Sequence, residues 1–241
     1  MAQAPDPNAA AVSPSDPWSD LVLTLPMFIG YHLGVIFLPI RNAADVVTRE
    51  LVALAGHDRA AYGGLTLAIG LAYVLVLGLA GRGHALRWQR FVLIAFEGIV
   101  YAVAVRLVAS YVVGRVFLGP DPATVQESGP FTGVVMSLGA GFYEELLFRV
   151  ALFGGGLHVV KLFFPVSSAT RRLVVPVVWA LITSAAFSAW HYIGPLGDPF
   201  EAQSFLFRWV CGLVFVTIYA LRGFAPVVWT HAVYDLWVLV F

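Results

Sequence analysis

The chain has 241 residues, of which 60% are hydrophobic and 12% are charged, and its mean hydropathy is +0.84. Soluble domains usually contain about 25% charged residues, so this composition argues against a soluble domain and indicates an integral membrane protein. The 14 basic and 14 acidic residues give a formal net charge of zero, which argues against a nucleic-acid partner. A single cysteine, Cys211, excludes an intrachain disulfide and a cysteine-rich zinc site.

Residues 1–20 contain four prolines and no lysine or arginine, and they lack the apolar core of a signal peptide. We expect them to form a disordered tail before a single transmembrane domain over residues 21–241. Within that domain, seven apolar runs approach or exceed the ~18 residues that a helix needs to cross a bilayer. They are residues 21–40, 63–80, 91–114, 131–155, 173–193, 205–221 and 225–241.

The apolar runs show no alternation of polar and apolar residues, which favours helices over the strands of a membrane barrel. The predicted fold class is therefore all-α, a polytopic membrane bundle of about seven transmembrane helices. Between the first two runs, residues 41–62 place apolar side chains largely on one helical face, with charges between them. This pattern predicts one interfacial amphipathic helix.

Lysine and arginine residues are unevenly divided between the two sides of the predicted bundle. Seven lie in loops on the side of the N-terminus, and four lie on the opposite side. Because cytoplasmic loops carry the excess of basic residues, we expect a cytoplasmic N-terminus, in a plasma or inner membrane.

Nine aspartate, glutamate, arginine and histidine residues lie within the apolar runs after residue 90, although an ionisable side chain near the bilayer centre costs at least ~2.5–3.5 kcal/mol. Each therefore needs a partner, a wet cavity or a chemical role. Glu97 and Arg106 are nine residues apart on one helix and cannot pair directly, so we expect partners on other helices. Arg208 is close to the start of its run and can extend to the lipid head groups.

The fourth run contains two adjacent glutamates and an arginine. Glu145 and Arg149 have the i,i+4 spacing of a helical face, which favours a charge-assisted pair. Glu144 lies about 100° around an α-helix from Glu145, which leaves its carboxylate freer and suits it to act as a general base. A salt-bridge cluster between helices is the alternative interpretation of these residues.

Two further runs contain histidine within apolar sequence. The fifth run ends with Phe187 and His191, and the seventh contains His231 and Asp235 at the i,i+4 spacing of one helical face. Two imidazoles and nearby carboxylates can activate water, either by direct deprotonation or through a bound Zn²⁺ ion. The residue types leave both routes open.

These three motifs together resemble those of the CPBP family of intramembrane proteases, also called the CAAX protease and bacteriocin-processing or Abi family. That family carries Glu-Glu-x-x-x-Arg, Phe-x-x-x-His and His-x-x-x-Asn/Asp on separate transmembrane helices, and this chain has them in the same order over about residues 130–241. Each motif is weak alone, but three in order are specific. The departure is Asp235, where members that cleave prenylated proteins usually carry asparagine.

The resemblance implies an intramembrane endopeptidase that acts on a membrane-associated peptide or lipidated protein, either a prenylated CAAX-type chain or a leader-type peptide. By this resemblance, Glu144 assisted by His191 polarises the attacking water. His231 and Asp235 face the oxyanion or orient its donors. The supporting residues are Glu145, Arg149 and Phe187.

The sequence leaves the cofactor open. The candidate catalytic residues Glu144, His191, His231 and Asp235 are also the candidate zinc ligands, and a metal-free glutamate mechanism is equally compatible with them. The alternative function is a non-catalytic membrane protein, either a proton-coupled transporter or an immunity-type scaffold. Transporters usually show internal repeats of hydropathy, and none is visible in this sequence, so the sequence favours the enzyme.

Overall fold

The computed structural model describes residues 17–38, 41–56, 58–81, 88–117, 129–163, 169–194 and 197–241. The regular structure within these ranges is helical throughout, which confirms the predicted all-α fold class. The predicted tail of residues 1–20 lies outside the described residues, except for its last four, which form the first turn of helix α1 (Pro17–Val35).

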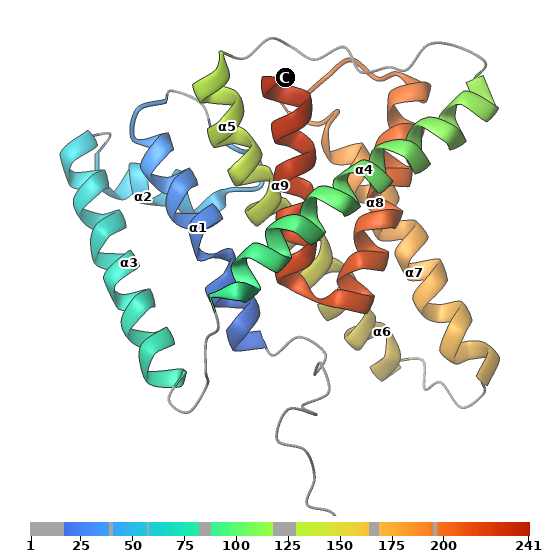
Figure 1. Ribbon diagram of the computed structural model, residues 1–241, viewed down its shortest axis with the longest axis horizontal. Helices are drawn as coiled ribbons and strands as arrows, with labels where there is room; N and C mark the ends of the chain where they lie inside the picture. Colours follow the sequence, from blue (N-terminus) through green and yellow to red (C-terminus); the bar gives the residue numbers. More distant parts are fainter. Residues whose placement is uncertain are drawn as a thin grey trace, which may run out of the picture.

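The helices follow the predicted apolar runs in chain order, as Figure 1 shows. After α1 come α2 (Val46–Leu54), α3 (Arg59–Ala80), α4 (Gln89–Phe117), α5 (Pro130–Gly139), α6 (Gly156–Phe163), α7 (Ala169–Trp190), α8 (Ala202–Arg222) and α9 (Phe224–Val240). Two π-helical segments, η1 (Ala140–Glu144) and η2 (Leu146–Gly155), join α5 to α6, so that Pro130–Phe163 is one continuous helix.

Five helices in the described ranges are long and apolar enough to cross a membrane. They are Arg59–Leu79, Gln89–Phe117, Pro130–Phe163, Arg172–Trp190 and Ala202–Arg222. Helix α9 is apolar but shorter, and α1 is not among the five. The membrane helix bundle is therefore confirmed, whereas the predicted number of seven transmembrane helices is not.

The predicted amphipathic segment, residues 41–62, is divided between two helices. Helix α2 covers its middle, and α3 already begins at Arg59. The Asp45 carboxylate accepts a hydrogen bond from the Thr48 N–H at the start of α2, and Asp58 caps α3 in the same way. Such caps satisfy backbone N–H groups that have no partner inside the helix, and here they mark the two helix starts.

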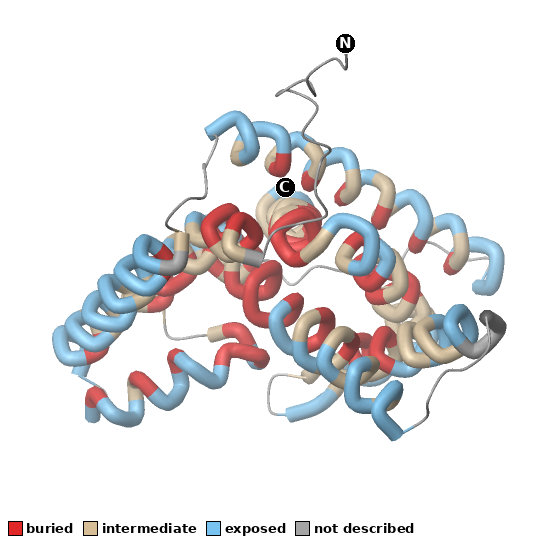
Figure 2. Tube along the Cα trace, turned by 90° about the horizontal axis from the view of Figure 1, so that it is seen from below, coloured by how far each residue is buried: buried red, intermediate tan, exposed pale blue. Residues whose placement is uncertain are grey.

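Helix α9 lies at the centre of the bundle, where it packs against α1, α4, α5, η1 and α8. Figure 2 shows buried residues gathered on the central helices and exposed residues along the outer ones. Helix α3 is an outer helix that packs on α1 and α2, and its Leu71 and Leu75 are each 63% exposed. An apolar helix with such an exposed surface is typical of a segment covered by lipid.

Glycines allow the central helices to approach closely. A Cβ atom on Gly141 of η1 would lie 2.7 Å from the Ala232 side chain and 2.8 Å from the Val228 carbonyl oxygen on α9. A Cβ atom on Gly212 of α8 would lie 3.1 Å from the Phe187 ring on α7. Small residues at helix crossings bring backbones together in membrane proteins. The first contact places the two glutamates directly beside α9.

The chain reverses between α8 and α9 at Gly223, whose φ of +96° is favourable for glycine and strained for other residues. The Phe224 N–H at the start of α9 donates to the Asp20 carboxylate of α1, at 2.7 Å. Arg222 contacts Glu97 of α4, with 2.7 Å between Nε and Oε1. Glu97 therefore has the charged partner on another helix that the sequence predicts.

Arg106 and Arg208 also have partners in the bundle. The Arg106 guanidinium lies 5.7 Å from the centre of the Phe207 ring on α8. Arg208 contacts Asp198, before the start of α8, with 2.6 Å between Nη2 and Oδ2. The Asp198 side chain is 51% exposed, so this pair lies at the surface of the bundle, as expected for an arginine near a helix end.

Candidate active site

Three helical regions bring the motif residues together. Glu144 and Glu145 lie where η1 meets η2, His191 directly follows α7, and His231 and Asp235 lie on α9. Ion-pair distances link Glu144 to His191 and Glu145 to His231. Because the two glutamates are adjacent in the chain, the two pairs form one cluster.

The first pair is the more accessible one. Glu144 Oε2 lies 3.9 Å from His191 Nε2, and the two side chains are 9% and 27% exposed. His191 Nδ1 lies 3.0 Å from the Phe187 carbonyl oxygen, so Nδ1–H donates there and Nε2 of the neutral ring can accept. Two atoms 3.9 Å apart can both contact one water at about 2.8 Å. The pair therefore has the geometry for holding a water molecule.

The second pair is fully enclosed. Glu145 Oε1 accepts from His231 Nδ1 at 2.6 Å, and Glu145 Oε2 lies 3.0 Å from Arg149 Nε. The Glu145 and Arg149 side chains are 0% and 1% exposed. The i,i+4 pair predicted from the spacing is present, whereas the contact with His231 was not predicted. On its other side, His231 Nε2 lies 3.5 Å from Asp235 Oδ2.

Aromatic rings surround the buried arginine and the imidazoles. The Arg149 guanidinium lies 4.2 Å from the centre of the Phe187 ring and 5.1 Å from that of Phe215. Phe187 also meets the rings of His191 and His231 edge-on, and Phe215 stacks on His231. Cation–π contacts of this kind stabilise a charge that has little access to water. Phe187 therefore contacts the buried arginine and both imidazoles, and its supporting role stays a prediction.

Glu144 ends the π-helical segment η1 and Glu145 lies between η1 and η2, so the helix predicted over residues 131–155 is continuous but not α-helical throughout. A π-helical turn closes through i to i+5 hydrogen bonds and is wider than an α-helical turn. The angle between neighbouring residues of a wider turn is somewhat smaller than the about 100° of an α-helix, so Glu144 and Glu145 still lie on different sides of the helix. The two carboxylates point to different partners, Glu144 toward the end of α7 and Glu145 toward α9.

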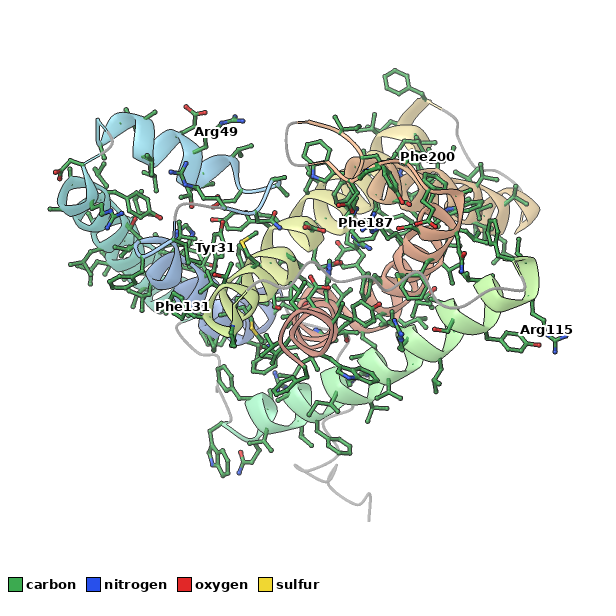
Figure 3. All side chains as sticks on the ribbon, turned by 90° about the horizontal axis from the view of Figure 1, so that it is seen from above. Tyr31, Arg49, Arg115, Phe131, Phe187 and Phe200 are labelled. Atoms are coloured by element: carbon green, nitrogen blue, oxygen red, sulfur yellow. The ribbon has the colours of Figure 1, made fainter. Side chains whose placement is uncertain are left out.

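Asn42 is a site contact that the motif analysis missed. Its Nδ2 lies 2.7 Å from Glu144 Oε1, and the residue is 7% exposed. It lies between α1 and α2, 102 residues before Glu144, in a segment whose pattern predicts an interfacial helix. Tyr31 of α1 accepts a hydrogen bond from the Asn42 N–H. Figure 3 shows Tyr31 and Phe187 on opposite sides of the continuous helix Pro130–Phe163. Only a tertiary contact connects Asn42 to the site.

The described part of the chain contains no group of three or more histidine, cysteine, aspartate or glutamate side chains arranged to hold a metal ion. His191 Nδ1 and His231 Nδ1 each contact an oxygen of the protein. The zinc ligand set expected from the sequence therefore stays a prediction.

Comparison with known families agrees with the motifs. Residues 126–237 match the family model described as type II CAAX prenyl endopeptidase Rce1-like. The resemblance to the CAAX proteases is confirmed. The match spans all three motifs, whereas residues before 126, including Asn42, lie outside it. No curated protein and no solved structure matches the chain.

Proposed function

We propose that the protein is an intramembrane endopeptidase that removes the C-terminal residues of a prenylated CAAX-type substrate through water activated by Glu144 and His191. The observation that carries this proposal is the accessible pair of Glu144 Oε2 and His191 Nε2, 3.9 Å apart, inside the region that matches the CAAX endopeptidases. A carboxylate and an imidazole at this separation are suited to general acid–base chemistry on one water.

The hydrolysis begins with a water in contact with Glu144 Oε2 and His191 Nε2. As the water oxygen attacks the carbonyl carbon, its proton passes to Glu144 and the carbonyl oxygen becomes an oxyanion. The protonated Glu144 then delivers that proton to the amide nitrogen of the leaving peptide as the carbon–nitrogen bond breaks. The products are a new carboxylic acid, which then releases its remaining proton to solvent, and a free amine, and Glu144 returns to its ionised form.

His231 and Asp235 form the side of the site that faces the oxyanion. The Glu145 carboxylate accepts a hydrogen bond from His231 Nδ1–H and so fixes the orientation of the ring. A proton carried by His231 Nε2 or by Asp235 Oδ2, which lie 3.5 Å apart, supplies a donor to the developing negative charge. Glu145 and Arg149 act through His231, because both are buried away from solvent.

A prenylated chain is the substrate class that fits this setting best. A prenyl group on the cysteine of a CAAX sequence partitions into the bilayer and brings the adjacent peptide to the depth of the helices. The leader-type peptide inferred from the motifs is the second substrate class, and the match to CAAX prenyl endopeptidases favours the first.

The test uses the full chain, purified in detergent and offered two forms of one CAAX peptide, prenylated and unprenylated. We expect mass spectrometry to show that the prenylated form loses the three residues after the cysteine. The unprenylated form should lose them at a much lower rate. Equal cleavage of both forms would reject the prenyl specificity. Absence of cleavage by folded protein would reject the enzymatic function.

A further inference from the structure

Asn42 makes four hydrogen bonds that together fix its position. The bonds are Asn42 N–H to Tyr31 Oη (3.1 Å), Asp45 N–H to Asn42 O (3.1 Å), Ala44 N–H to Asn42 Oδ1 (2.8 Å) and Asn42 Nδ2 to Glu144 Oε1 (2.7 Å). Two of them, with Ala44 and Asp45, lie within the segment between α1 and α2, and one attaches this segment to Tyr31 of α1. The fourth reaches the carboxylate of the proposed general base.

The orientation of the Asn42 amide is determined by its neighbours. The Ala44 N–H can only donate, so the atom that faces it must be the amide oxygen. The nitrogen therefore faces Glu144, and the bond at 2.7 Å is one in which Asn42 donates to a carboxylate oxygen. A bond to an ionised acceptor is stronger than one between neutral groups.

The segment that carries Asn42 is anchored to the same helix as Glu144. Tyr31 is fully buried, and its hydroxyl donates to Asp45 Oδ2 at 2.8 Å while it accepts from Asn42. The Tyr31 ring packs edge-on against Tyr143, the residue before Glu144, and a Cβ atom on Gly139 would overlap it. Movement of Asn42 relative to Glu144 is therefore restricted by packing as well as by hydrogen bonds.

The contact with Asn42 occupies one oxygen of Glu144 and leaves the other for chemistry. Oε2 has no hydrogen-bond partner among the described residues and is the atom that faces His191. The terminal torsion of a glutamate is broad, so a carboxylate without such a contact samples many orientations. We infer that Asn42 is a positioning residue that holds Glu144 Oε2 toward His191 and the attacking water. This inference rests on the proposed function.

The main test compares the kinetics of Asn42→Ala and Asn42→Asp with the wild type, using the prenylated peptide. We expect kcat to fall about 10- to 100-fold while KM changes less than about 2-fold, because orientation of the reacting groups is lost and substrate contacts are kept. Asn42→Asp keeps the shape but replaces the donor by an anion beside Glu144. It should lose at least as much kcat as Asn42→Ala.

A double-mutant cycle tests whether Tyr31 affects Glu144 by holding Asn42 in place. Tyr31→Phe keeps the ring and removes the hydroxyl that holds Asn42, so we expect a kcat loss of about 3- to 10-fold. In the Asn42→Ala background the same change should cost almost nothing further, because both act on one contact. Full additivity of the two losses in kcat would overturn the inference that Tyr31 acts through Asn42.

Ser137→Ala is the matched control for loss of a buried hydrogen bond. Ser137 is fully buried on α5 and donates to the Gly133 carbonyl oxygen, away from both carboxylates. We expect a small fall in melting temperature and an unchanged kcat. The same pattern in Asn42→Ala would show that Asn42 is merely structural and would overturn the inference.

The failure of the proposed function can be told apart from the failure of this inference. If the wild type cleaves no CAAX peptide, the function fails, and experimental structures of the wild type and Asn42→Ala then decide the role of Asn42. A Glu144 carboxylate turned away from His191 in the variant supports positioning. An unchanged carboxylate in the variant overturns it.

Discussion

The helices from α5 to α9 and those from α1 to α4 contribute to the site in different ways. The later helices supply the acids, imidazoles and buried arginine of the three motifs, and they contain most of the region that matches the CAAX endopeptidases. The earlier region supplies Asn42, which orients Glu144, and much of the exposed apolar surface, for example on α3. Motif spacing thus identifies the reacting side chains, while a distant segment determines how one of them points.

The largest expected effect breaks the enclosed pair in the motif region. Glu145→Gln removes the anion that Arg149 and His231 share, and it leaves Arg149 buried without a charged partner. We expect the free energy of unfolding to fall by about 3–5 kcal/mol, seen as low folded yield and a lower melting temperature. Glu144→Gln, one residue earlier, should keep a normal yield. Equal folded yields for the two variants would contradict the assigned roles.

A smaller effect distinguishes the packing of the two regions through paired glycine substitutions. Gly141→Ala places a methyl group within 2.9 Å of the α9 backbone, and overpacking of this kind typically costs about 1–3 kcal/mol. Gly78→Ala on α3 meets nothing within 4 Å and should be neutral or stabilising. Thermal melting of both variants measures the difference. A Gly141→Ala variant as stable as the wild type would show that the contact between η1 and α9 has room for a methyl group.

The smallest expected effect concerns Asp235, at which this chain departs from prenyl-protein proteases. If Asp235 orients His231, Asp235→Asn should keep activity within about 10-fold, because the amide preserves shape and adds donors. If Asp235 binds zinc, the same change should lower metal retention and activity by a factor of about ten or more. Metal analysis of active protein, before and after prolonged chelation, separates the two. We expect chelation to leave the activity intact.

Local patterns predict local features of this molecule well. The apolar runs give the helices, and the i,i+4 spacing gives the contact between Glu145 and Arg149. Each of these depends on residues that are close together in the sequence. The number of membrane crossings is less accessible, because α1 and α9 fall outside the five helices long and apolar enough to cross a membrane.

Other features depend on contacts that spacing cannot report. The π-helical turns at Glu144 accompany close packing of Gly141 on α9, which no periodicity indicates. The bond from His231 to Glu145 joins two motifs 86 residues apart, and the bond from Asn42 to Glu144 joins a motif to a segment without one. Only the folded arrangement brings these atoms within 3 Å.

The most direct test of Glu144 as the general base measures cleavage of the prenylated CAAX peptide by folded Glu144→Gln protein. The substitution keeps the size of the side chain and removes its ability to take a proton from water. General acid–base catalysis typically contributes 10²- to 10⁴-fold, so we predict a loss of kcat of about that size at an unchanged melting temperature. A folded Glu144→Gln variant that cleaves at the wild-type rate would contradict it.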